Sequence, residues 1–150
     1  IAGRLIAKGI EFNRIIDETF YQKTYVQNQV LGRALMESIL LLDGKIIMGR
    51  MRQKDMEFYG VTHKDLEGIV NQLRVTKGVE VAIFLHEIGN QEYKASLRSN
   101  GRVDVSAVCA YFGGGGHVKA AGCTMHGTLH DVVNNLTLHI EQQLLQEEQA

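Results

Sequence analysis

The chain has 150 residues, 45% of them hydrophobic and 22% charged, and its 16 basic and 17 acidic residues give a formal net charge of −1. This composition excludes an intrinsically disordered chain, a collagen-like chain and a disulfide scaffold, and the length predicts one domain with a sizeable core. Because the net charge is close to zero, binding of a polyanion would have to come from a local site.

The first third of the chain predicts two helices. Hydrophobic residues recur at helical spacing in residues 1–24 and again in 28–42, after which Asp43-Gly44 forms a turn. The short link between the helices favours an antiparallel pair. The apolar runs are too short for a membrane span or a signal peptide, so we expect a cytoplasmic protein with no membrane partner. The start at Ile1 rather than Met indicates a piece of a longer protein.

In the middle of the chain the spacing of hydrophobic residues changes from the helical period to the two-residue period of β-strands. Residues 46–51 predict a short strand, and a helix is expected from Thr62 to a stop at Gly78. Residues 79–86 and 93–98 alternate in hydrophobicity around a Gly-Asn pair, which is typical of a β-hairpin.

The last third predicts a short helix capped by Asp104, a helical turn at Val118–Ala121, a strand at Cys123–His126 and a long helix that starts at Thr128. The two cysteines are expected to be small buried residues of a protein in a reducing compartment. Taken together, the elements predict an α/β fold in which a mixed β-sheet is flanked by helices and preceded by an N-terminal helical pair.

One stretch, residues 112–122, combines unusual backbone freedom with basic side chains, in the order Phe-Gly-Gly-Gly-Gly-His-Val-Lys-Ala-Ala-Gly. Glycines let successive N–H groups point into one concavity, and a helical turn that begins at His117 would add its free N–H groups and its dipole. The pattern predicts an anion site, above all for phosphate, and it matches neither a Walker loop nor a dinucleotide fingerprint. A loop that merely joins two helices is the alternative.

Two cationic side chains are candidates for holding that anion. Arg98 ends the second hairpin strand between hydroxyl residues, which suits bidentate phosphate recognition, and His117 can donate to a phosphate oxygen at the mouth of the loop. Structural alternatives stay open, namely a solvated charge for Arg98 and a packed histidine for His117. Lys119 is a further local candidate, whereas His126 and His130 do not indicate a metal site.

The strings Ser-Leu-Arg-Ser at 96–99, Gly-Gly-Gly-Gly-His at 113–117 and Ala-Ala-Gly at 120–122 resemble the C-terminal, DHH-associated domain of the DHH phosphoesterase superfamily. The resemblance is strongest to the NrnA-like branch, whose members degrade short oligoribonucleotides and dephosphorylate pAp. It implies that residues 45–150 form this substrate-binding domain and that residues 1–44 are the helical end of the catalytic domain with a linker helix.

The resemblance also implies roles for individual residues. Arg98 and His117 would hold the terminal phosphate or nucleotide of the substrate, the four glycines would line the pocket, and Ser99 is a weaker candidate. The substrate-binding residues predicted in this way are Arg98, Ser99, Gly113, Gly114, Gly115, Gly116 and His117.

Catalysis in this superfamily uses a two-metal centre, usually of manganese, built from aspartates and histidines that include an Asp-His-His triplet. This sequence has no such triplet, and its six aspartates are scattered. We therefore predict no catalytic residue, metal ligand or cofactor in this chain, and manganese is implied only for the missing catalytic domain. The expected partners are that domain, a nucleotide or short single-stranded RNA, and possible association into a homodimer.

Three alternatives remain at this point. The chain could be a free-standing nucleotide-binding or RNA-binding module without an enzymatic parent. Within the superfamily, the parent could be a cyclic di-AMP phosphodiesterase or an enzyme that acts on single-stranded DNA. A structural domain whose glycine run is only a turn is the third reading, and it predicts that phosphates leave stability unchanged.

Overall fold

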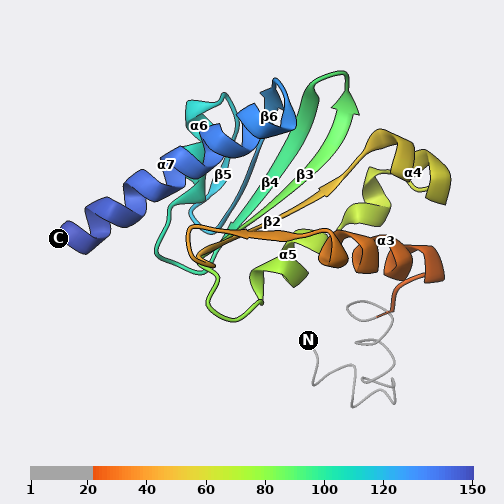
Figure 1. Cartoon of the computed structure of the whole chain (residues 1–150), viewed down its shortest axis with the longest axis horizontal. Helices are drawn as coiled ribbons and strands as arrows, with labels where there is room; N and C mark the ends of the chain where they lie inside the picture. Colours follow the sequence, from red (N-terminus) through yellow and green to blue (C-terminus); the bar gives the residue numbers. More distant parts are fainter. Residues whose placement is uncertain (1–21) are drawn as a thin grey trace, which may run out of the picture.

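The computed structural model describes residues 22–150, and its centre is a six-stranded sheet with the strand order β1-β2-β3-β4-β6-β5 (Figure 1). The strands are β1 (Ile39–Leu41), β2 (Ile46–Met51), β3 (Val81–Gly89), β4 (Glu92–Ser99), β5 (Gly115–His117) and β6 (Ala120–His126). The helices are α3 (Tyr25–Met36), α4 (Gln53–Tyr59), α5 (Ile69–Arg74), α6 (Val105–Tyr111) and α7 (Leu129–Gln149), with a 3-10 turn η2 (His63–Leu66). Strands β2 and β3 pair in parallel and their neighbours pair antiparallel, so the predicted α/β fold with a mixed sheet is confirmed.

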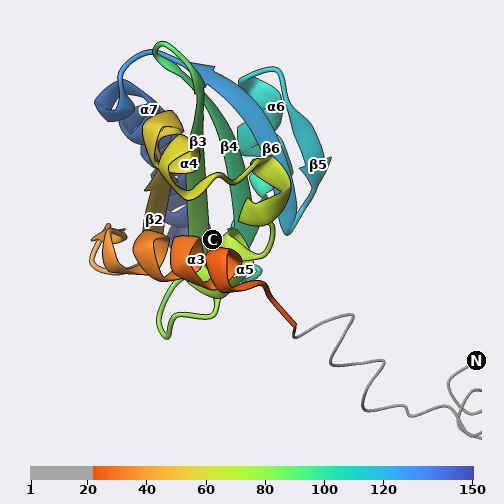
Figure 2. The same ribbon diagram turned by 90° about the vertical axis from the view of Figure 1, so that its right-hand side faces the viewer.

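The helices cover the two faces of the sheet unequally. Helices α6 and α7 lie on one face, where they pack on the odd-numbered residues of β3 and β4 in one hydrophobic core. Helices α3, α4 and α5 lie on the other face, over β2 and β3 (Figure 2). Strand β3 is therefore buried on both faces, which explains its continuous hydrophobic run. Beyond it, the second face of β4, β6 and β5 carries exposed residues and is open.

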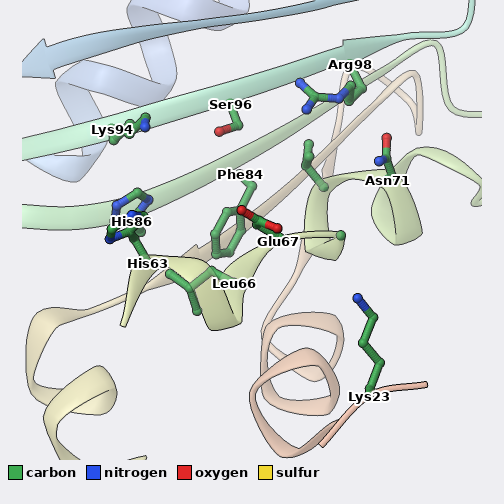
Figure 3. A pocket seen from close by; sticks show the side chains of 12 residues that line it. Lys23, His63, Leu66, Glu67, Asn71, Phe84, His86, Lys94, Ser96 and Arg98 are labelled. Atoms are coloured by element: carbon green, nitrogen blue, oxygen red, sulfur yellow. The ribbon is translucent and has the colours of Figure 1, made fainter. Parts of the chain in front are cut away.

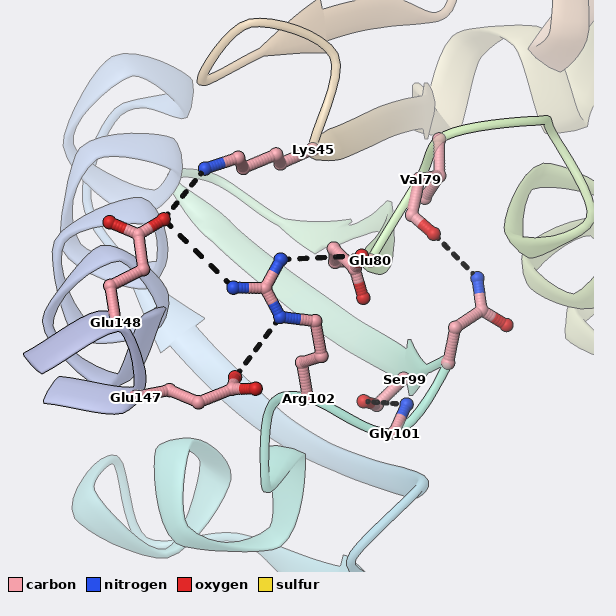
Figure 4. A network of polar contacts seen from close by, with 9 residues as sticks. Lys45, Val79, Glu80, Ser99, Gly101, Arg102, Glu147 and Glu148 are labelled. Atoms are coloured by element: carbon pink, nitrogen blue, oxygen red, sulfur yellow. Dashed lines mark hydrogen bonds and ion pairs between the residues drawn. The ribbon is translucent and has the colours of Figure 1, made fainter. Parts of the chain in front are cut away.

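The C-terminal helix is fixed at both ends. A capping box begins it, because the Thr128 hydroxyl accepts from the Asp131 backbone N–H. Near the other end, the Arg102 guanidinium donates to Glu147 over 3.1 Å, and Lys45 lies 3.3 Å from Glu148 (Figure 4). This helix supplies four buried residues to the core, and no helix among residues 22–150 is long and apolar enough to cross a membrane.

Several local predictions are confirmed. The β3–β4 hairpin forms, β2 matches the predicted short strand, and α7 starts after the predicted cap. The Asp104 side chain accepts from the Ala107 N–H and caps α6. Cys109 and Cys123 are both buried free thiols in the core between α6 and β6.

The predicted helix over 28–42 is wrong in its second half. Helix α3 ends at Met36, and the apolar run that follows is strand β1, which pairs antiparallel with β2 through a turn at residues 42–45. The run Ile-Leu-Leu-Leu fits either period, and pairing with β2 decides between them. Most of the predicted helix over 1–24 lies outside the described residues, while residues 22–24 are not helical. The boundary at 44/45 stays a prediction.

Two further predictions about helices need correction. Helix α4 was not expected, and the helix after Thr62 is divided into η2 and the short α5, which ends at Arg74 rather than at Gly78. Gly68 separates the two parts because it adopts a left-handed conformation, with φ of 89°.

The predicted helical turn at Val118–Ala121 is wrong. Residues 115–117 and 120–126 are strands of one antiparallel hairpin, with Val118 and Lys119 at its turn. The small residues after the turn allow β6 to pair closely with β5 on one side and β4 on the other. No helix N-terminus therefore begins at His117, so neither free helical N–H groups nor a helix dipole contributes to an anion site there.

Candidate functional site

The pairing register brings Arg98 and His117 to the same face of the sheet. Arg98 lies opposite Ala120 across the β4–β6 pair, and Ala120 lies opposite His117 across the β6–β5 pair. Directly opposed residues of neighbouring strands project to the same face. Arg98 and His117 thus stand in one row, two strand spacings or about 10 Å apart, with only an alanine side chain between them.

The turn that carries His117 is anchored to the rest of the domain. The Lys119 carbonyl accepts from the Ser99 N–H, and the Val118 carbonyl accepts from the Val105 N–H, each over 2.9 Å. These two hydrogen bonds tie the tip of the β5–β6 hairpin to the end of β4 and the start of α6. The position of His117 relative to the end of β4 is therefore fixed by backbone contacts.

The four glycines serve different purposes. A Cβ atom on Gly114 would lie 2.2 Å from the Gly122 carbonyl oxygen, and one on Gly116 would lie 2.5 Å from the Ala120 oxygen, so both positions need glycine for close packing of β5 on β6. Gly113 ends α6 in a left-handed conformation with φ of 84°. Gly115 differs from these three, because nothing lies within 4 Å of its Cβ position and its φ is not left-handed.

Beside this row, a cavity of about 530 Å³ opens between the sheet and the η2–α5 segment (Figure 3). Its floor is formed by alternate residues of β3 and β4, since Phe84 pairs with Ser96 and His86 pairs with Lys94. The full set of lining residues is Lys23, His63, Leu66, Glu67, Gly68, Val70, Asn71, Phe84, His86, Lys94, Ser96 and Arg98.

The cavity carries an excess of positive charge. Three cationic and two histidine side chains line it, against one acidic residue, Glu67. Burial, with the nearby Arg74 guanidinium, lowers the pKa of Arg98 from its ordinary value. Arg98 donates to the Leu97 carbonyl over 2.9 Å and forms no ion pair with a carboxylate among residues 22–150. An uncompensated, half-buried guanidinium is a strong site for an anion.

A second cavity of about 520 Å³ continues the open face toward the sheet edge. Gly113, Gly114 and Gly115 line it together with residues of β6, and Lys94 lines both cavities. The predicted site residues are thus divided between two adjoining hollows, with Arg98 in the first and Gly113, Gly114 and Gly115 in the second, while Gly116 lines neither. His117 is exposed and lines neither of them.

The structure does not bring Ser99 to this face. Ser99 pairs with Val81, lies on the α7 side of the sheet and is 2% exposed, and its hydroxyl accepts from the Gly101 N–H. Ser96 lies on the open face instead. The sequence could have predicted Ser96 instead of Ser99, because strand alternation puts Lys94, Ser96 and Arg98 on one face.

The described residues do not assemble a metal centre. Among residues 22–150, no three His, Cys, Asp or Glu side chains come together in a way that could hold a metal ion. The acidic residues are instead used locally, as caps and in ion pairs. Asp55, for example, is buried between Arg33 and Arg52, and its hydrogen bond to Arg52 keeps the pKa of its carboxyl below the ordinary value.

Known proteins show the same arrangement of elements. The chain is 26% identical over 128 residues to the bifunctional oligoribonuclease and PAP phosphatase NrnA of Thermus thermophilus, a match that covers 85% of this chain and 37% of that protein. The crystal structure of an exopolyphosphatase-related protein from Bacteroides fragilis superposes with a TM-score of 0.85 at 26% identity, over 95% of this chain and 42% of that one. The chain therefore spans less than half of these relatives.

More distant structures share the fold alone. The C-Ala domain of alanyl-tRNA synthetase from Aquifex aeolicus has a TM-score of 0.50 at 16% identity, over 70% of this chain and 98% of that domain. A pGpG-specific phosphodiesterase from Vibrio cholerae has a TM-score of 0.56 at 12% identity, over 80% of this chain and 39% of that one. The DHHA1 domain family matches residues 43–145, which include every strand from β2 to β6 and most of α7. The chain belongs to the DHHA1 family, the C-terminal domain of DHH-family proteins.

Proposed function

We propose that this chain is the substrate-binding domain of a DHH-family phosphoesterase that hydrolyses short oligoribonucleotides or pAp. The observation that carries the proposal is the row in which Arg98 and His117 share the open face, next to a cavity with excess positive charge. The name of the Thermus thermophilus relative supports the choice of substrates.

Arg98 is suited to hold a phosphate because its planar guanidinium can donate two parallel hydrogen bonds to one phosphate. His117, across the small Ala120 side chain, would donate to a second oxygen of the same group or to the attached nucleotide. Hydrogen bonds to charged groups contribute about 1.5–3 kcal/mol each, so a few of them suffice for micromolar affinity.

In this proposal the chain binds and orients, while hydrolysis depends on residues supplied from elsewhere in the parent protein. A two-metal centre, of manganese in this superfamily, would activate water and stabilise the leaving oxygen. The described residues hold no cluster that fits such a centre. The contribution of this domain is to place the scissile phosphate, which can lower a barrier substantially when the geometry is right.

Calorimetry tests the proposal directly. The 150-residue chain is titrated without metal with pAp and with a 5′-phosphorylated trinucleotide RNA, beside Arg98→Ala and His117→Ala. We expect micromolar binding that weakens about tenfold or more in each variant. Arg50→Ala is the matched control, because Arg50 pairs with Leu85 and lies on the opposite face.

The result against the proposal is equal binding by wild type and both variants, or no binding of either ligand. A cyclic dinucleotide included as a competitor separates the two substrate classes. Displacement of pAp at equal or lower concentration would favour a cyclic dinucleotide phosphodiesterase as the parent.

A further inference from the structure

Three basic side chains from three different elements meet at the end of the first cavity that lies away from Arg98. His63 comes from η2, His86 from β3 and Lys94 from β4 (Figure 3). His86 and Lys94 lie directly opposite each other in the sheet, and His63 reaches them from the segment that covers the cavity. The proposed phosphate site at Arg98 makes no use of this cluster.

His86 is the most unusual member of the cluster. It is 8% exposed, lines the cavity and stacks on Phe84 with ring centroids 6.4 Å apart. Its imidazole makes no hydrogen bond with any residue of the described part of the chain. The buried side-chain nitrogen and oxygen atoms that lack a partner among the described residues do not include those of His86, so its ring nitrogens face the cavity, where a ligand that enters can bind them.

The charges around His86 favour an anion. Burial is the main cause that lowers the pKa of His86, and the positive charges of Lys94 and His63 lower it further. The groups that line the cavity around the ring are these two residues, Phe84 and, on the covering segment, the acidic Glu67. A phosphate bound beside Lys94 would favour the protonated form of His86 and could accept a hydrogen bond from its ring N–H.

The distance between the two cationic ends limits which ligand can reach both. Lys94 and Arg98 are four residues apart on β4, which is about 14 Å at the rise of an antiparallel strand. Six single bonds join the phosphorus atoms of adjacent phosphates in a nucleic acid strand. Three backbone bonds span about 3.8 Å between consecutive Cα atoms of a protein, so six bonds of similar length span about 7 Å. Phosphates separated by two nucleotides therefore match the spacing, and adjacent phosphates do not.

We propose that His63, His86 and Lys94 form a second phosphate subsite, so that the cavity binds a single strand of at least three nucleotides with its first phosphate at Arg98 and its third at this cluster. The inference rests on the proposed function, because Arg98 must hold the first phosphate. It adds a preference for chain length, since a mononucleotide or pAp can occupy only one end.

The test compares a 5′-phosphorylated mononucleotide with a 5′-phosphorylated trinucleotide RNA, in wild type and in Lys94→Gln and His63→Gln, whose side chains are both exposed. Each variant should bind the trinucleotide about tenfold more weakly and the mononucleotide within twofold of wild type. Lys77→Gln, an exposed lysine outside both cavities, is the matched control and should bind both ligands normally. For wild type, the slope of log K against log salt should be steeper for the trinucleotide, by about 0.7 for each added phosphate contact.

Proton uptake provides an independent measurement. The NMR titration of the His86 imidazole should move to higher pH when the trinucleotide is added, and should stay unchanged with the mononucleotide. The inference is overturned if Lys94→Gln weakens both ligands equally, or if the trinucleotide leaves the His86 titration in place. In those cases the proposed function stands, provided that Arg98→Ala still weakens the mononucleotide. If wild type binds neither ligand, both the subsite and the proposed function are refuted.

Discussion

The glycine run offers a sharp prediction, because neighbouring glycines of the same segment are expected to respond in opposite ways to the same substitution. In Gly114→Ala, the added methyl would lie 2.2 Å from the Gly122 carbonyl oxygen and 2.6 Å from the Cys123 Cβ atom. Both atoms belong to β6, one to its backbone and one to a buried side chain, so the Gly114 segment and β6 would have to move apart. Overpacking of this kind costs about 1–3 kcal/mol, which lowers Tm by about 2–12 °C in a domain of this size.

Gly115→Ala should behave differently. Its Cβ position has no neighbour within 4 Å and its backbone suits any residue, so alanine fits. The substitution removes conformational freedom from the unfolded chain, and stability should hold or rise by about 0.4–1 kcal/mol. Gly115 pairs with Gly122, which pairs with Ser96, so its methyl would stand on the open face and obstruct a ligand. Affinity for pAp should therefore fall while Tm does not.

The assay is thermal unfolding by calorimetry together with pAp titration of wild type and both variants. Two results would refute the reasoning. If Gly115→Ala lowers Tm as far as Gly114→Ala does, the packing of β5 on β6 has been assigned to the wrong glycine. If Gly115→Ala binds pAp as wild type does, the second cavity is not part of the binding surface.

Three further predictions concern stability. Burial lowers the pKa of His86 in the folded state, so the unfolded chain takes up a proton at a higher pH than the folded chain does. The free energy of unfolding should therefore fall as pH drops from about 6.5, the pKa of an unperturbed histidine, toward the pKa of folded His86. Urea denaturation between pH 5 and 8 should show this loss of stability, and His86→Gln should make the loss smaller. Asp55→Asn leaves two partly exposed arginines without their carboxylate and should cost about 1–3 kcal/mol in the same assay, less than a fully buried pair would. Leu136→Ala in the core should cost about 2–5 kcal/mol, whereas Leu138→Ala on the exposed side of the same helix should change stability by less than about 0.5 kcal/mol.

The parts of the fold that could be predicted from sequence are those in which local and tertiary preferences agree. The β3–β4 hairpin has alternating hydrophobicity and a turn signal, and α7 has a capping box and a regular apolar face, so each was predictable over most of its length. The residues around 39–42 and 118–121 were predicted as helix because short apolar or small-residue runs have no clear period. In both places pairing within a tight hairpin decides the structure, because β1 turns back into β2 and β5 turns back into β6. Neither hairpin has the alternating hydrophobicity that would have indicated it.

The candidate site was likewise predictable only in part, since local sequence indicated some of its residues and the tertiary structure brought them together. Arg98 and His117 could be singled out from residue type and neighbouring glycines, but their common row depends on the β4–β6–β5 register, which no local pattern contains. His86 and His63 could not be found in this way, since a histidine in a buried strand and one in a surface turn have no sequence signal in common. Only the cavity shows that the two belong together.

The asymmetry of the sheet gives a physical reason for the location of the site. An antiparallel strand with one open face normally carries polar residues there for solubility alone, and such residues are of mixed charge. On β4 the outward residues of the open face are Glu92, Lys94, Ser96 and Arg98. Glu92 lies at the far end, opposite His126, and the three that line the first cavity can all donate hydrogen bonds and are not acidic. On the opposite side of the domain, basic residues are balanced, as in the contacts of Arg102 with Glu80 and Glu147. The first cavity thus presents its donors on the open face of β4, where a phosphate-bearing ligand can also approach β6 and β5, the next strands of the sheet.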